Sequence, residues 1–145
     1  MQVRSCWSVL TKKSKDEEES AQIVLAQAAK KLQDLQASLS RMNTLLQEYT
    51  DKASTVQASL HSMAQTANTR QFILQLQDLI ARVEADKLQA QAAYDQSKLS
   101  LMQATHQRMK METMQEKDAQ AVKTWERKGN DKDLKYFLES EAESL

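Results

Sequence analysis

A long ladder of apolar residues constrains this chain more than any other feature of its sequence. Its members are separated alternately by three and four positions: Leu25, Ala28, Leu32, Leu35, Leu39, Met42, Leu46, Tyr49, Ala53, Val56, Leu60 and Met63. Residues with this spacing share one face of a helix, and a 3.5-residue repeat predicts a left-handed supercoil against a second helix. Continued backwards, the same register passes through Glu18, Ser14 and Thr11 and reaches Trp7, so the first segment is less strongly specified.

The composition permits helix almost throughout the chain. The 145 residues include no proline and one glycine, so very few positions interrupt a helix. Aromatic residues make up 5% of the chain, which is too few to fill a compact multilayer core. Twenty Lys and Arg balance twenty Asp and Glu, so no net field attracts nucleic acid. We therefore expect one thin, all-helical domain.

A hairpin turn is expected where the ladder ends. The segment from Ser62 to Arg70 is small and polar, and Asn68 with Gln71 resembles a capping box at a helix start. We place the turn at residues 63–70, between a helix of about residues 3–62 and a second of about 71–128. The predicted fold class is all-α, an antiparallel coiled-coil hairpin over residues 1–128.

The second helix begins with a clear seam at Ile73, Leu76, Ile80 and Val83, and two continuations are then open. One keeps the same steps through Lys87, Ala90, Tyr94, Ser97, Leu101, Ala104, Arg108, Met111, Gln115, Asp118, Val122 and Trp125. The other runs through Leu88, Ala92, Leu99, Met102 and Met109 and is about as apolar. The pattern alone does not separate a stutter from a polar, hydrated seam.

The two ends of the hairpin carry further expectations. With a turn near Ala67, antiparallel pairing brings Trp7 and Leu10 level with Val122 and Trp125, and we expect the two tryptophans to touch. Gly129 and Asn130 form the strongest helix breaker, and Asp131 is a plausible cap after them. We expect a short C-terminal helix or flexible tail over residues 129–145, with an apolar patch at Leu134, Tyr136, Phe137 and Leu138.

The sequence carries no signature of catalysis. His61 and His106 are far apart, and neither metal-ligand spacing nor a glycine-rich phosphate loop is present. Asp16 to Glu19 point around a helix axis and are interpreted as a solvated face. We expect no catalytic, metal or cofactor site. Cys6 is the only cysteine, and no apolar run reaches signal-peptide or membrane-spanning length, so we expect a cytoplasmic protein without an integral membrane segment.

A second apolar ridge lies beside the seam next to the expected turn. Phe72 and Leu79 are one heptad apart, and Leu45 lies beside Met42 and Tyr49 on the facing helix. A two-stranded coil buries only its own seam, so this surplus favours a docking site. A wider local core that seals the turn is the equally weighted alternative.

Several short motifs resemble the FliJ family, the general chaperone and stalk component of the bacterial flagellar type III export apparatus. They are Ser8-Val9-Leu10, Gln47-Glu48-Tyr49, Asn68 before Gln71-Phe72-Ile73-x-x-Leu76, Trp125-Glu126-Arg127, and Asp131-Lys132-Asp133-Leu134. The likeness covers most of the chain. It implies a hairpin whose paired terminal ends enter the pore of a hexameric export ATPase, and a region that engages the cytoplasmic domain of the export gate. It also implies contact with export chaperones and peripheral association with the inner membrane.

The resemblance assigns candidate site residues by position. Those matching the export-gate face are Met42, Leu45, Tyr49, Phe72 and Leu76, while Leu79 and Val83 depart from the smaller or polar types found there. For the ATPase end we expect a role for the apolar cluster of Trp7, Leu10, Val122 and Trp125, which equally fits closure of the coil.

Three alternatives compete with this interpretation. The stalk protein of the virulence-type injectisome is built alike, and the pattern does not separate the two systems; we prefer the flagellar one. A structural scaffold would form a parallel dimer, whereas a hairpin is expected to be a monomer when isolated. A prefoldin-type holdase needs β-hairpins between its helices, and no alternating strand pattern is present.

Overall fold

The computed structural model describes residues 5–58 and 63–143 of the chain, and every described residue is α-helical. Helix α1 spans Ser5–Ala58 and helix α2 spans Met63–Glu143. The absence of proline and the alternating three- and four-residue ladder account for two helices of this length. The structure confirms the predicted all-helical chain with two long helices in contact.

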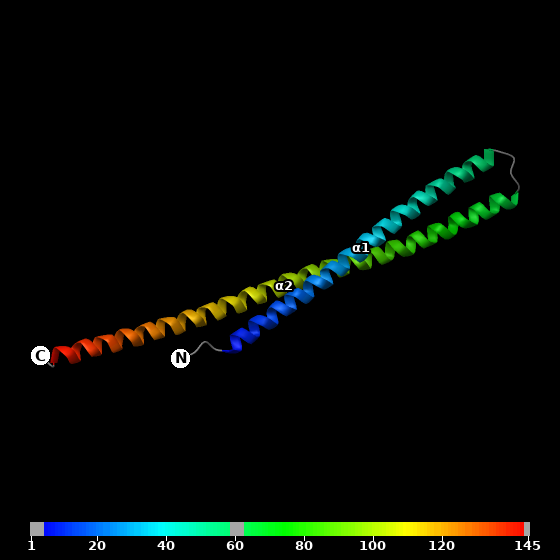
Figure 1. The fold of residues 1–145 in the computed structure, drawn as a ribbon. Coiled ribbons are helices and arrows are strands. Elements are labelled where there is room, and N and C mark those ends of the chain that lie inside the picture. The colour runs from blue at the N-terminus through cyan, green and yellow to red at the C-terminus, as the bar shows by residue number, and fades with distance from the viewer. Residues whose placement is uncertain (1–4, 59–62, 144–145) are drawn as a thin grey trace. The chain divides into compact units, whose positions relative to one another are not determined.

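The chain divides into two compact units, and each contains parts of both helices. The terminal unit consists of Met1–Gln22 and Ser100–Leu145, and the tip unit consists of Ile23–Leu99. Within each unit, α1 and α2 run side by side (Figure 1). In the tip unit the helices are cyan and green, and in the terminal unit α1 is blue beside the yellow to orange part of α2.

Cross-helix contacts establish the antiparallel direction separately in each unit. In the tip unit, Tyr49 lies nine residues before the end of α1, and its ring contacts Phe72, nine residues after the start of α2. In the terminal unit, Glu18 pairs with Arg108, and the earlier Lys15 pairs with the later Glu112. Both units therefore have the direction that a hairpin requires.

The turn predicted at residues 63–70 is wrong, because these residues form the first turns of α2. Their polarity was misleading, because Ala, Gln and Arg are good helix formers. The hydroxyl of Thr69 also donates a hydrogen bond to the Gln65 carbonyl within the helix. Met63, expected in the seam of the first helix, instead begins α2 and is 91% exposed. Leu60 and the side chain of Val56 lie outside the described residues.

The C-terminal break predicted at Gly129 and Asn130 is also wrong. Helix α2 continues through both residues to Glu143, so the described part of the chain contains no separate short C-terminal helix. Glycine in a helix interior costs about 1 kcal/mol relative to alanine, which weakens a long helix without ending it. Among the described residues no glycine has a positive φ, so Gly129 does not form the left-handed cap that the prediction assumed.

The burial pattern decides between the two registers left open for the second helix. In the tip unit, Ala90 and Ser97 are buried, and Lys87 and Tyr94 are half-buried, as the first register requires. Leu88 and Leu99 of the competing register are 74% and 52% exposed. In the terminal unit, Val122 is likewise buried, whereas Met102 and Met109 are exposed. The seam therefore keeps one register and accepts polar members.

Candidate functional site

The apolar core of the tip unit lies close to the start of α2. Leu39 of α1 and Leu76 and Ile80 of α2 are each 6 to 7% exposed and form one cluster. Met42, Leu46 and Val83 pack against this cluster. Burial of each leucine-sized side chain contributes roughly 1.5 to 3 kcal/mol, so this cluster helps to hold the two helices of the unit together.

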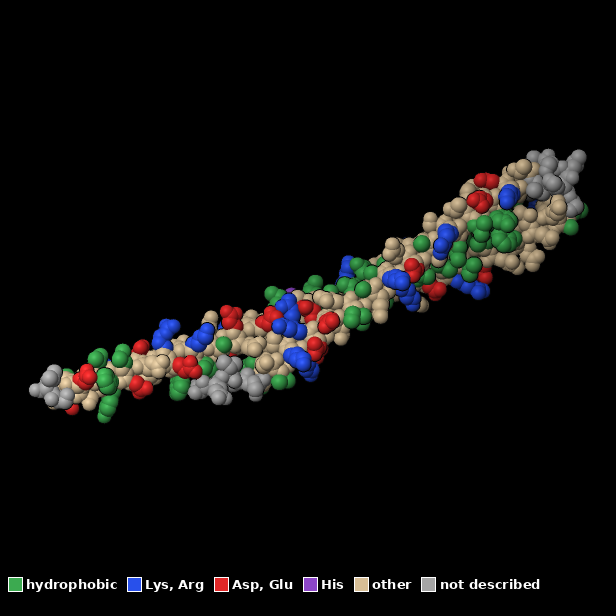
Figure 2. All heavy atoms as spheres, in the orientation of Figure 1, with side chains coloured by type: hydrophobic (Ala, Val, Ile, Leu, Met, Phe, Trp, Pro, Cys, Tyr) green, Lys and Arg blue, Asp and Glu red, His purple; other side chains and the backbone are tan. Residues whose placement is uncertain are grey.

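Three exposed apolar side chains flank this core on one side. Leu45, Phe72 and Leu79 each directly precede a seam residue, namely Leu46, Ile73 and Ile80. In an antiparallel pair such positions lie on the same side of the seam. The three residues are 36%, 37% and 44% exposed, and we refer to them as the docking face. Figure 2 shows hydrophobic side chains gathered across both helices near this end of the tip unit.

Tyr49 holds the ring of Phe72 in place. The two ring centroids are 4.4 Å apart with an interplanar angle of 37°. The ammonium of Lys52 lies 5.2 Å from the centroid of the Tyr49 ring. An aromatic pair of this kind contributes roughly 0.5 to 1.5 kcal/mol beyond area burial, so Phe72 is presented by a fixed partner.

The structure divides the predicted gate-binding residues into two groups. Leu76 belongs to the core and Met42 packs against it, as their seam positions predict. Leu45 and Phe72 are exposed, and Tyr49 is half-buried beneath Phe72. Val83 packs against the core. Leu79, one heptad after Phe72, is exposed. The ridge residues Leu45, Phe72 and Leu79 thus stay exposed instead of joining a wider core, and docking at them stays a prediction.

The terminal unit has a more polar seam. Thr11 and Ser14 are 5% and 2% exposed at positions where a leucine would ordinarily pack. Their hydroxyls donate hydrogen bonds to carbonyls of their own helix, Thr11 to Trp7 at 2.7 Å and Ser14 to Leu10 at 2.9 Å. These bonds satisfy the buried hydroxyls but add no contact between the helices.

An ion-pair network joins the two helices of the terminal unit. Arg108 of α2 donates from Nε to Glu18 of α1 at 2.7 Å and from Nη1 to Glu112 at 2.9 Å. Lys15 of α1 lies 3.8 Å from the Glu112 carboxylate. The side chains of Arg108 and Glu18 are 27% and 16% exposed, so this pair lies in the seam itself.

The network shifts the titration of its central pair. The hydrogen bond from Arg108 lowers the pKa of the Glu18 carboxyl, against a smaller opposing effect of burial. The hydrogen bond to Glu18, followed by that to Glu112, raises the pKa of Arg108. Both shifts favour the charged forms, so the pair remains ionised at neutral pH.

The four residues predicted at the ATPase end differ widely in exposure. Val122 is 5% exposed and Trp7 is half-buried, whereas Leu10 and Trp125 are 40% and 56% exposed. The expected contact between the tryptophans is wrong, since among the described rings Trp7 and Trp125 do not contact each other. The turn was placed too late: helix α2 already begins at Met63, which shifts the partner of Trp7 towards the start of the chain.

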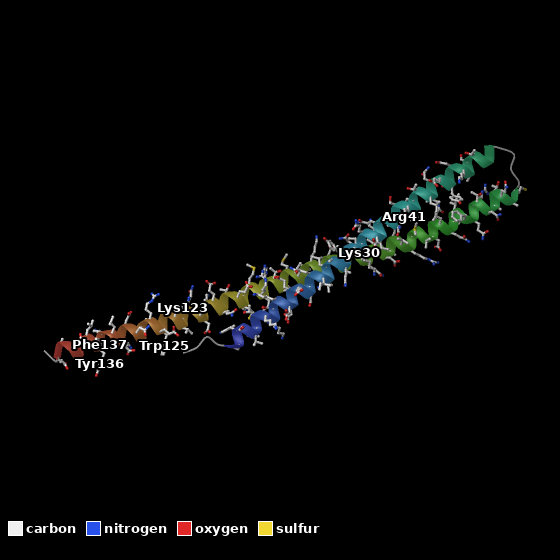
Figure 3. The ribbon with its side chains drawn as sticks, viewed as in Figure 1. Lys30, Arg41, Lys123, Trp125, Tyr136 and Phe137 are labelled. Atoms are coloured by element: carbon white, nitrogen blue, oxygen red, sulfur yellow. The ribbon has the colours of Figure 1, made fainter. Side chains whose placement is uncertain are left out.

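Beyond Val122, α2 has an exposed surface on all sides. Every residue from Lys123 to Glu143 is exposed except the half-buried Gly129. Figure 3 shows Trp125, Tyr136 and Phe137 along this single-helix stretch, where they are 56%, 77% and 58% exposed. The predicted apolar patch at Leu134, Tyr136, Phe137 and Leu138 is thus present on a continuous helix.

Sequence reasoning missed the ion pair between Glu18 and Arg108, although the signal was available. Both residues occupy seam positions of the register that the sequence predicts, and they carry opposite charges. Glu18 was instead assigned to a solvated acidic face with Asp16, Glu17 and Glu19. Facing charged residues at seam positions are a known device for fixing the alignment of two helices.

Other classes of site find no support among the described residues. No group of three His, Cys, Asp or Glu side chains in the described ranges is placed to hold a metal ion. His106 is exposed, and His61 lies outside the described residues. Neither described helix contains a segment long and apolar enough to cross a membrane.

Comparison with protein families gives one match, to the flagellar FliJ protein family over residues 8–134. The chain belongs to this family. Comparison with curated proteins and with solved structures gave no match. FliJ proteins are non-enzymatic structural and chaperone proteins, and membership implies a role related to flagellar export. The matched range includes the docking face, the ion-pair network and Trp125.

Proposed function

We propose that this FliJ-family chain acts as a stalk and chaperone component of the flagellar type III export apparatus. Its tip unit binds the cytoplasmic domain of the export gate, and its terminal unit binds the hexameric export ATPase. It works in the cytoplasm and is held at the inner membrane by these partners. Export chaperones are the third class of partner.

The docking face carries the gate-binding part of this proposal. Leu45, Phe72 and Leu79 are exposed directly beside the best-packed core in the tip unit. Interface hot spots are often large aromatic side chains in well-packed surroundings. Phe72 meets both requirements, because Tyr49 supports its ring and more than a third of its surface is open.

Gate binding is tested with the full chain and the purified cytoplasmic domain of an export gate. We expect Phe72→Ala with Leu79→Ala to weaken binding at least tenfold by calorimetry, because both side chains lie outside the core. Leu88→Ala is the matched control, since Leu88 is 74% exposed in the same unit but off the docking face. Helix content by circular dichroism should stay the same in all variants. Unchanged affinity of the double variant would reject the docking face.

The exposed stretch of α2 supports the ATPase-binding part. A helix that extends beyond its last buried residue, Val122, offers apolar side chains such as Trp125 to a partner. Adding the chain to purified export ATPase should raise the hexamer population and the hydrolysis rate. Trp125→Ala should reduce both effects, whereas Met102→Ala, exposed in the same unit, should not. An ATPase whose turnover is unchanged at saturating protein would contradict this part.

A further inference from the structure

A groove lies on the side of the tip unit opposite the docking face. Its walls include Gln36 and Asn43, which directly follow the seam residues Leu35 and Met42, and Glu84 and Gln91, which directly follow Val83 and Ala90. In an antiparallel pair, residues that directly follow these seam positions lie on one side of the seam. The docking-face residues directly precede seam positions and lie on the other side. The groove has a volume of about 910 Å³, and both helices contribute to it.

Lys87 gives this groove its most distinctive chemical group. It occupies a seam position between Val83 and Ala90 and is half-buried, whereas most lysines of the chain are exposed. Among the residues that the structure describes, no carboxylate forms an ion pair with Lys87. A partly buried ammonium that forms no ion pair within the described chain favours a partner that brings a carboxylate to it.

Apart from Glu84 and two leucines, the other residues that line the groove are polar and uncharged. Two of the amides are held in place by aspartates one turn later, since Gln47 donates to Asp51 and Gln91 donates to Asp95, each at 3.1 Å. Their amide oxygens stay available as acceptors. Leu39 in the groove and Leu88, 74% exposed, add apolar contact area.

The shape of the groove selects the form of the partner. On α1 the lining runs from Gln36 to Gln47, which is about 16 Å of helix at 1.5 Å per residue. Side chains spaced by three and four positions on both walls leave gaps that accept the matching ridges of a third helix. Such packing is the usual way in which a helix lies in a groove between two others.

We propose that this groove binds an amphipathic helix of a partner protein, with an acidic side chain paired to Lys87 and a leucine-like side chain against Leu39 and Leu88. This surface is distinct from the docking face and extends the proposed function. Because the two surfaces lie on opposite sides of the tip unit, the partner helix and the export gate can bind at the same time.

The test uses the full chain and a synthetic helical peptide of about three heptads with Leu along one face and a single Glu in the middle of that face. A second peptide carries Gln in place of the Glu, and a third carries Lys. We expect the Glu peptide to bind at least tenfold more tightly than the Gln peptide. Amide chemical shifts should change at residues 36–47 and 84–91.

Substitution at Lys87 provides the decisive comparison. Lys87→Gln should remove the preference for the Glu peptide, and Lys87→Glu should reverse it in favour of the Lys peptide. Lys30→Gln is the matched control, because Lys30 is an exposed lysine of the same unit outside the groove. Equal affinities for all three peptides, shifts centred on Phe72, or no binding at millimolar concentration would overturn the proposal.

Affinity for the gate domain, measured in the same variants, distinguishes a failure of this inference from a failure of the proposed function. Lys87→Glu should leave affinity for the gate domain unchanged, whereas Phe72→Ala should leave peptide binding unchanged. Loss of gate binding in Lys87→Glu would show that the groove belongs to the gate interface, which overturns the inference without touching the docking face.

Discussion

Arg108 donates a 2.7 Å hydrogen bond to Glu18 across the two helices of the terminal unit, at facing positions of the seam. Thr11 and Ser14 occupy the neighbouring seam positions of α1 and form hydrogen bonds only within their own helix. The alignment of the two helices in this unit therefore depends on charge to a greater degree than in the tip unit, where Leu39, Leu76 and Ile80 pack together.

The first prediction concerns this pair. Glu18→Gln and Arg108→Gln should each lower stability, because each leaves a partly buried charge without its partner. The double variant should lose less than the sum of the two single losses, and urea unfolding measures the difference. Lys30→Gln is a control for loss of an exposed charge. Strictly additive losses would show that Glu18 and Arg108 do not interact in solution.

The second prediction follows from the lowered pKa of Glu18. A carboxyl whose pKa is lower in the folded state contributes its full stabilisation above the ordinary glutamate pKa of about 4.5. This contribution is lost as the pH falls from there through the lowered value. Melting temperature should therefore drop more between about pH 5 and pH 3 in the parent chain than in Glu18→Gln. Identical pH profiles would contradict the shift.

The third prediction separates core from surface in the tip unit. Leu76→Ala should destabilise the chain by roughly 2 to 3 kcal/mol, because it removes a side chain from the cluster with Leu39 and Ile80. Phe72→Ala should cost about 1 kcal/mol, since it chiefly loses the contact with Tyr49. Urea unfolding followed by circular dichroism measures both. A larger loss for Phe72→Ala would place Phe72 in the core.

The fourth prediction concerns Gly129. A Cβ atom added there meets no other atom within 4 Å, and the residue is helical. Gly129→Ala should therefore stabilise this part of α2 by about 1 kcal/mol and slow amide hydrogen exchange in the surrounding turns. Ala121→Gly, at an exposed position of the same helix, should have the opposite effect. Faster exchange in Gly129→Ala would indicate a turn at this position.

The seam could be predicted from the sequence because periodicity is a property of many residues together. A single register accounts for the burial of Leu32, Leu39, Leu76 and Ile80, and for the polar members that follow in α2. Choosing between the two continuations required the structure, because the buried Ala90 and Ser97 are less apolar than the exposed Leu88 and Leu99. Position in the register, not hydrophobicity, decides their burial.

The helix ends could not be predicted, because they depend on few residues. Residues 63–70 combine turn-like polarity with good helix propensity, and the second property prevails in α2. That error moved the expected partner of Trp7 and produced the false tryptophan contact. For the candidate site, the sequence identified the surplus apolar residues near the turn, but only packing separates exposed Phe72 from buried Leu76.

The register of the tip unit is the claim on which the docking face depends, and spin-label distances test it most directly. In a Cys6→Ser background, one variant carries labels at the exposed Gln47 and Gln75, and the other at Gln47 and Ala85. Dilution with unlabelled chain keeps the distances intramolecular. Because Tyr49 opposes Phe72, the account predicts that the pair at 47 and 75 is closer than the pair at 47 and 85. A shorter distance for the pair at 47 and 85 would contradict it.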